Sequence, residues 1–222
     1  MTASHLAWYT VRASGYTALV LLTLSMVLGL LLSLNIRSPR WPRFLTNDLH
    51  GFTTLVALVF IAIHLGATVL DPFMHFGLSG ALVPFASGYR TLGMAAGIVA
   101  GYLMLGVWIS SRLRRRIGWR TWRTLHYAVF AIYALSVAHT LVAGEDASTA
   151  WGRWIVVGSV VLVAALTALR ALGGRTVPAK TAETGPSHSP SARHPAGTMW
   201  RLRERPSVTP SQTNSSRGGH YG

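Results

Sequence analysis

Five long apolar runs constrain the fold of this chain more than any other feature of its sequence. Each run is close to the roughly 20 apolar residues that an α-helix needs to cross a bilayer, and short polar connections separate the runs. We therefore expect an all-α fold, a polytopic membrane helix bundle of about five transmembrane helices. The expected spans are residues 15–36, 48–70, 89–111, 121–143 and 151–172.

The charged residues lie mainly in the connections between the runs and in the C-terminal segment. The chain has 20 lysines and arginines against 6 carboxylates, which gives a formal net charge of +14. Such a charge is compatible with nucleic-acid binding. Its distribution, however, is typical of a membrane protein, in which basic residues flank the spans. We therefore expect the chain to contact membrane lipid and not to bind nucleic acid.

Basic and acidic connections alternate, and this alternation predicts the orientation. The connections after the first and third runs are rich in arginine, whereas those after the second and fourth contain Asp71, Glu145 and Asp146. Because basic loops face the cytoplasm, the N-terminus is expected outside. Residues 173–222 are rich in Pro, Ser, Thr, Gly and Arg, so we expect a disordered cytoplasmic tail after a membrane domain of residues 1–172.

Cysteine is absent, which excludes disulfides, iron–sulfur clusters, thiolate-ligated metals and haem attached through cysteine. Any redox cofactor must be held by histidine or by non-covalent contacts. Five of the nine histidines lie outside the apolar runs and are interpreted as surface or solvated residues, although the loop histidine among them could also line an acceptor site. These five are His5, His75, His188, His194 and His220.

The other four histidines occur as two pairs. His50 and His64 lie near the two ends of residues 49–66, and His126 and His139 are placed similarly in a later run. Fourteen residues put His50 and His64 roughly 21 Å apart along a helix axis and on nearly the same face. If spans two and four are parallel, each histidine of one has a counterpart at matching depth on the other. We interpret the pattern as two stacked bis-histidine sites for haem.

Other readings of these histidines remain. A single histidine in a membrane helix is often a packed or hydrogen-bonded polar residue. Zinc and di-iron centres usually also have carboxylate or cysteine ligands close to their histidines, and the Glu-x-x-His motif of di-iron centres is absent. A proton-coupled transporter usually places Asp or Glu inside the membrane, and here none lies deep in a run. Haem needs only a neutral imidazole on each face of the iron, in an apolar environment.

The spacing of the second pair does not match that of the first. His126 and His139 are 13 residues apart, about 140° out of register on an ideal α-helix. Local 3₁₀ tightening, helix tilt, or haems at different azimuths could each absorb this difference.

The chain resembles the ferric reductase-like transmembrane domain. This family includes NADPH oxidase membrane domains, ferric reductases, and the haem-binding membrane subunit of bacterial methionine sulfoxide reductase systems. The resemblance covers residues 8–146 and is carried by the paired histidines. Three segments support it: WYTVRASG, DPFMHFGLSGALVPFASGYR and RRRIGWRTWRTLH, which are similar to those of small bacterial members.

The resemblance implies two b-type haems that carry electrons across a bacterial cell membrane to an extracytoplasmic acceptor. By position it implies that His50 and His126 ligate the inner haem, and His64 and His139 the outer one. Many members have six spans, and oxidases and reductases continue into a flavin and NADPH domain. Residues 173–222 are too few and too polar for such a domain, so a separate flavoprotein or a quinol is the expected electron donor. A haem-containing anchor or sensor subunit, without electron transfer of its own, is the alternative.

Other residues near the expected sites have two interpretations each. Guanidinium groups match carboxylates bidentately, so Arg12 and Arg90 at the outer end and Arg123 at the inner end are candidate partners of haem propionates. Arg43 is better explained by lipid headgroups or the positive-inside rule. The row formed by Gly93, Gly97 and Gly101 favours close packing of a neighbouring helix over contact with a flat cofactor.

Overall fold

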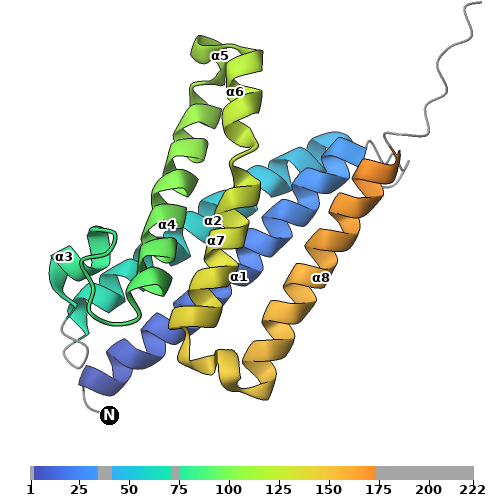
Figure 1. The fold of residues 1–222 in the computed structure, drawn as a ribbon. Coiled ribbons are helices and arrows are strands. Elements are labelled where there is room, and N and C mark those ends of the chain that lie inside the picture. The colour runs from blue at the N-terminus through green and yellow to red at the C-terminus, as the bar shows by residue number, and fades with distance from the viewer. Residues whose placement is uncertain (1–2, 35–41, 72–75, 174–222) are drawn as a thin grey trace, which may run out of the picture. The chain divides into compact units, whose positions relative to one another are not determined.

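A computed structural model describes residues 3–34, 42–71 and 76–173. These residues form helices and connections, with no strand among them. Five helical segments are long and apolar enough to cross a membrane, which confirms the expected all-α membrane bundle (Figure 1). The expectation of a disordered tail falls on residues 174–222, outside the described ranges, as does the position of His75.

The first two helices begin earlier than expected. Helix α1 runs from Ala3 to Leu34, because residues 3–14 contain neither glycine nor proline to stop it. Helix α2, Arg43–Leu70, starts directly after Pro42, whose extended backbone occupies the N-cap position. Asn47 and Asp48 are good N-cap residues by type and stand at the expected start of the second span, but both lie inside the helix. The preceding proline, not the next pair of polar side chains, marks the start.

The third and fourth runs form a helical hairpin. Helix α4 spans Thr91–Arg112 and leads into the short helix α5, Arg114–Ile117. Gly118, at φ +81°, then turns the chain, a conformation that glycine adopts without steric cost. The expected fourth span is two helices in line, α6 (Trp119–His126) and α7 (Val129–Ala143).

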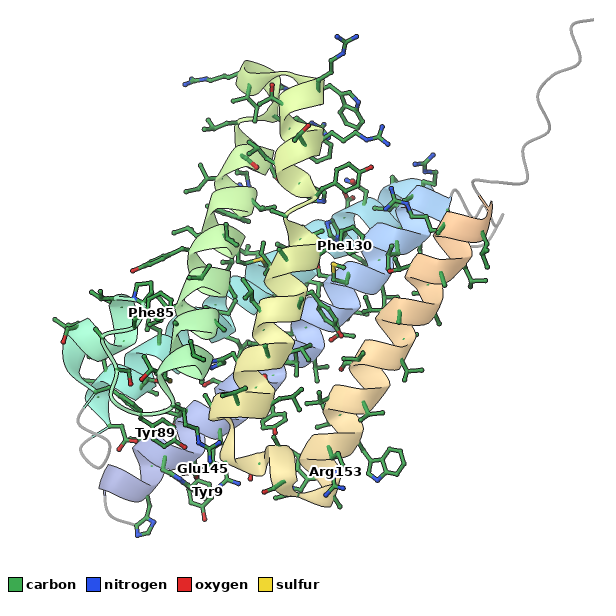
Figure 2. All side chains as sticks on the ribbon, viewed as in Figure 1. Tyr9, Phe85, Tyr89, Phe130, Glu145 and Arg153 are labelled. Carbon is green, nitrogen blue, oxygen red and sulfur yellow. The ribbon has the colours of Figure 1, made fainter. Side chains whose placement is uncertain are left out.

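Two connections lie at the same end of the molecule. Residues 76–88, between the second and third spans, do not form a span, as expected, and contain the short helix α3, Gly77–Leu82. Between α7 and the last helix, α8 (Ala150–Gly173), lies a 3₁₀ turn, η1, at Glu145–Ser148. Figure 2 shows Glu145 and Arg153 at this turn, at the end of the view where Tyr9 and Tyr89 also lie.

The spans form two packed pairs. Helix α1 packs along α2, α4 packs along α7, and α8 lies against α1. The pairs meet where α1 contacts α7 and α2 contacts α4, and Figure 1 shows α4 and α7 crossing the line of α1 and α2. The core between the spans contains Leu22, Met26, Leu30, Ala57, Met104, Val107, Ile132, Tyr133 and Val163.

Large apolar side chains also cover the outside of the helices. Phe52 and Val59 of α2, and Trp154 and Val161 of α8, are at least half exposed. A soluble domain rarely exposes so much contiguous apolar surface, but a helix facing lipid needs it. The protein is therefore an integral membrane protein.

Candidate bis-histidine sites

The structure brings the four intramembrane histidines together as two pairs. The rings of His50 on α2 and His126 on α6 have centres 6.2 Å apart. The rings of His64 on α2 and His139 on α7 have centres 6.1 Å apart. The ring planes cross at 77° and 85° respectively. Each pair therefore has one ring from each of the two helix pairs, facing across their interface.

The separation within each pair is the one that a shared metal ion requires. Imidazole nitrogens bind metal ions at ~2.0 Å, so two imidazoles on opposite sides of one ion have ring centres about 6 Å apart. Two histidine rings that merely pack against each other have no reason to adopt this separation in both pairs. Among the described residues, no group of three or more His, Cys, Asp or Glu side chains could hold a metal ion. Each pair thus offers two imidazoles, the number of histidine ligands that bis-histidine haem ligation uses.

Three of the histidines are oriented by backbone carbonyls. The Nδ1 atom of His50 lies 2.9 Å from the Ser25 oxygen, that of His64 lies 2.8 Å from the Val11 oxygen, and that of His139 lies 2.8 Å from the Gly93 oxygen. A carbonyl can only accept, so Nδ1 carries the proton in each ring. The neutral tautomer that results leaves Nε2 free as a ligand, the arrangement usual for metal-bound histidine.

The fourth histidine is held differently. The Nδ1 atom of His126 is buried and has no hydrogen-bond partner among the residues that the structure describes. Its ring stacks on Trp122, with centres 5.0 Å apart and planes 27° apart. The Trp122 indole N–H in turn donates to the Ser111 hydroxyl at 3.1 Å. Stacking and this tether, rather than a carbonyl, therefore orient His126.

Glycines provide the space for three of the rings. A Cβ atom on Gly15 would lie 3.0 Å from the His64 ring, and one on Gly29 would lie 3.5 Å from the His50 ring. A Cβ atom on Gly97 would lie 2.5 Å from Nδ1 of His139. Gly97 belongs to the glycine row singled out in the sequence, where close helix packing was the favoured explanation. Gly15 and Gly29 were not predicted.

A signal for the missed glycines was present. Gly15 and Gly29 are 14 residues apart, the same interval that separates His50 and His64. When two antiparallel helices have the same 14-residue interval, one with glycines and the other with histidines, each glycine can face one histidine ring. In the glycine row of α4, Gly93 and Gly97 both face α7, whereas a Cβ on Gly101 would meet nothing within 4 Å.

A change of helix type explains the 13-residue interval. Around the α6–α7 junction, the amides of Tyr127, Ala128 and Phe130 bond carbonyls three residues earlier, at 3.1–3.3 Å. Such 3₁₀ bonds turn the chain by about 120° per residue instead of about 100°. Three or four such residues add roughly 60–80° of rotation about the helix axis. The His126–His139 interval is one residue shorter than the His50–His64 interval and so lacks roughly 100° of rotation, most of which the 3₁₀ residues supply.

The candidate arginines have protein partners. Arg12 forms an ion pair with Asp146, and its guanidinium lies 3.9 Å from the centre of the Trp8 ring. Arg90 donates to the Val142 carbonyl at 2.6 Å. These contacts place both arginines beside the His64–His139 end, where they were expected.

The remaining two arginines lie at the other end. Arg123 is 3.4 Å from the Tyr127 hydroxyl, in the helix that carries His126. Arg43 donates to the Leu32 carbonyl at 3.4 Å, which links the facing ends of α1 and α2. A role for Arg12, Arg90 or Arg123 in binding a cofactor stays a prediction.

Comparison with known protein families gives one match. Residues 14–137, more than half of the chain, match the family described as ferric reductase like transmembrane component. The matched range contains His50, His64 and His126 and ends two residues before His139. In the comparisons with curated proteins and with solved structures, nothing matches. The chain belongs to the ferric reductase-like transmembrane family.

Proposed function

We propose that the protein is a transmembrane b-type cytochrome, which carries electrons across the membrane through two bis-histidine haems to an extracytoplasmic acceptor. The family indicates membrane electron transfer and generally binds haem. One observation carries the more specific proposal. Two imidazole pairs, each with ring centres about 6 Å apart, face each other at two depths of the same bundle.

The chain's own histidines would hold the haems, and neighbouring groups would orient those histidines. His50 and His126 would hold the inner haem, and His64 and His139 the outer one. When bound, each haem would supply one-electron redox chemistry. The carbonyls of Ser25, Val11 and Gly93 keep three rings in one tautomer. A hydrogen bond of this kind also makes an imidazole a more basic ligand.

The surrounding side chains would keep the sites dry. The core between the helices is apolar, with Met104, Ile132 and Val107 among its buried members. Burial in a low-dielectric environment is one of the means by which a protein tunes a bound haem. Arg12, Arg90 and Arg123 were the arginines expected to pair with the propionates. Of these we propose Arg90 and Arg123, because Arg12 forms an ion pair with Asp146.

Donor and acceptor would be separate molecules. The family suggests a membrane protein that works with separate redox partners, and we propose a flavoprotein or a quinol as donor on the cytoplasmic side. The basic segment from Arg112 to Arg123 would face the cytoplasm, and the acidic connection at Glu145 and Asp146 would face outward. The His64–His139 site would then be the one nearer to the acceptor.

A spectrum tests the proposal directly. Purified full-length protein should show low-spin b-type bands in a reduced-minus-oxidised spectrum, with about two haems per chain. The quadruple variant with alanine at His50, His64, His126 and His139 is the control and should lack the bands. A folded, pigment-free wild-type preparation would contradict the proposal. Reduction by a quinol analogue would separate an electron carrier from a haem-containing anchor or sensor.

A further inference from the structure

A polar cross-link joins the two helix pairs at the end where His64 and His139 lie. Arg12 of α1 forms an ion pair with Asp146 of η1, and its Nε donates to the carboxylate. The Asp146 side chain is only 2% exposed, and that of Arg12 is 28% exposed. Tyr9 of α1 and Glu145 of η1 mark the two segments that the ion pair joins in Figure 2.

Each partner of the ion pair is close in sequence to the groups that seat one histidine. Val11, the residue before Arg12, supplies the carbonyl that orients His64. Gly15, less than one turn later, lies against the His64 ring. Asp146 follows the end of α7, seven residues after His139. The ion pair therefore connects the α1 segment that holds His64 to the α7 end that carries His139.

The two helix pairs otherwise pack mostly within themselves. Helix α1 packs chiefly on α2, and α7 chiefly on α4, while α1 and α7 touch over a small area. Helix α8, which follows η1, also packs against α1. The separation of His64 and His139 spans this smaller interface. A buried carboxylate that loses its cation is strongly destabilised, so Asp146 constrains the position of α1 relative to η1.

We propose that Arg12 and Asp146 are positioning residues, which together set the separation of His64 and His139 across the interface. In this role Arg12 is committed to Asp146 and does not bind the propionate of the group held between those histidines. The inference rests on the proposed haem function for its spectroscopic test. It makes a separate claim about the protein itself, which can be measured without haem.

The spectroscopic test compares the two single variants, Arg12→Gln and Asp146→Asn. If the residues act as a unit, both variants and their double mutant should lose the outer haem to a similar degree, lowering the ratio from about two haems per chain to about one. Arg153→Gln is the matched control, because Arg153 is an exposed arginine at the same turn that donates to the Ser148 carbonyl. It should keep both haems. Outer-haem loss in Arg12→Gln alone, with Asp146→Asn unchanged, would overturn the proposal and return Arg12 to propionate binding.

The haem-independent test uses the absence of cysteine. Spin labels on Leu70→Cys of α2 and Leu141→Cys of α7, whose parent side chains are 77% and 50% exposed, report the separation of the two helix pairs. In apo-protein the distance distribution should be narrow with the ion pair intact and broader or shifted in both single variants. The exchanged pair, Arg12→Asp with Asp146→Arg, should restore it. An unchanged distance distribution in both single variants would overturn the proposal, even if the protein binds two haems. If the variants broaden the distance distribution but the wild-type protein binds no haem, the result would count against the proposed function only.

Discussion

The imidazoles of His64 and His139 are equivalent in kind, since each is tied through Nδ1 to a carbonyl of its own helix pair. Loss of either should leave the outer iron with a single protein ligand. We expect His64→Ala and His139→Ala to have similar spectra, each retaining the inner haem. Their double mutant should be little worse than either, because residues that act as a unit are not additive.

The complementary set completes this experiment. His50→Ala and His126→Ala should form a second matched pair that lacks the inner haem, and His50→Ala with His64→Ala should lack both. The measurement is haem content together with the low-temperature absorption bands of each variant. The pairing would be refuted if His64→Ala removed the same haem as His126→Ala.

Gly97 offers a second test at the level of one residue. A methyl group there would sit 2.5 Å from Nδ1 and 2.8 Å from Cε1 of His139, so Gly97→Ala should displace the ring and its bond to Gly93. Overpacking of this kind costs about 1–3 kcal/mol. We expect loss or a spectral shift of the outer haem, measured as above.

The same helix provides the control for Gly97→Ala. A Cβ atom on Gly101, one turn further on, would have no neighbour within 4 Å. Gly101→Ala should keep both haems, and by helix propensity it should be neutral or stabilising by up to ~1 kcal/mol. Equal behaviour of the two variants would mean that Gly97 does not seat the ring.

At the residue scale, the sequence predicted the histidine pairs but not what orients them. The pairing of His50 with His126 and of His64 with His139 was expected from their spacing, from the parallel orientation that the charges predict for spans two and four, and from the family resemblance. The carbonyl partners and the Arg12–Asp146 ion pair depend on helix rotation, which spacing does not specify. Asp146 reads as an ordinary loop carboxylate in the sequence, yet it is 2% exposed in the structure.

At the scale of elements, the junction of α6 and α7 was the least predictable feature. Tyr127 and Ala128 include neither glycine nor proline, so nothing local indicates a break in residues 121–143. The 3₁₀ bonds there rotate His126 toward His50, which is a tertiary requirement. Among the three explanations that the 13-residue interval left open, local tightening is the one that the structure supports.

This junction leaves His126 dependent on Trp122 of its own short helix. Trp122→Ala removes the stacked ring and the tether to Ser111, so the inner haem should be weakened and the outer one retained. Ser111→Ala removes only one hydrogen bond, worth about 1 kcal/mol, and should have a smaller effect. Titration of apo-protein with haem measures both.

Trp154→Ala is the control for this experiment, because Trp154 is a tryptophan of α8 that is 75% exposed. It should leave both sites unchanged. A Trp122→Ala variant with wild-type affinity at both sites would show that the α6–α7 backbone alone holds His126.

At the scale of the whole molecule, hydropathy was sufficient to predict five spans, because each must be apolar along its length to cross a bilayer. Their ends were less accurate, as the early starts of α1 and α2 show. Polar residues such as Asn47 and Asp48 are tolerated inside a helix where it leaves the apolar region. Which helices pack together depends on side-chain fit, which hydropathy does not encode.

The orientation of the molecule in the membrane gives a last prediction. The arginine-rich α5–α6 segment is expected in the cytoplasm and the η1 connection outside. Since the chain has no cysteine, single cysteines report these sides without background. Ser148→Cys, at an exposed position of η1, should react with a membrane-impermeant maleimide in intact cells, whereas Arg115→Cys, exposed in α5, should react only after lysis. Removing one arginine leaves five in the segment of Arg112, Arg114, Arg116, Arg120 and Arg123, so Arg115→Cys should not invert the chain. The opposite labelling pattern would reverse which histidine pair is nearer to the cytoplasm, and with it the proposed direction from donor to acceptor, while leaving both pairs intact.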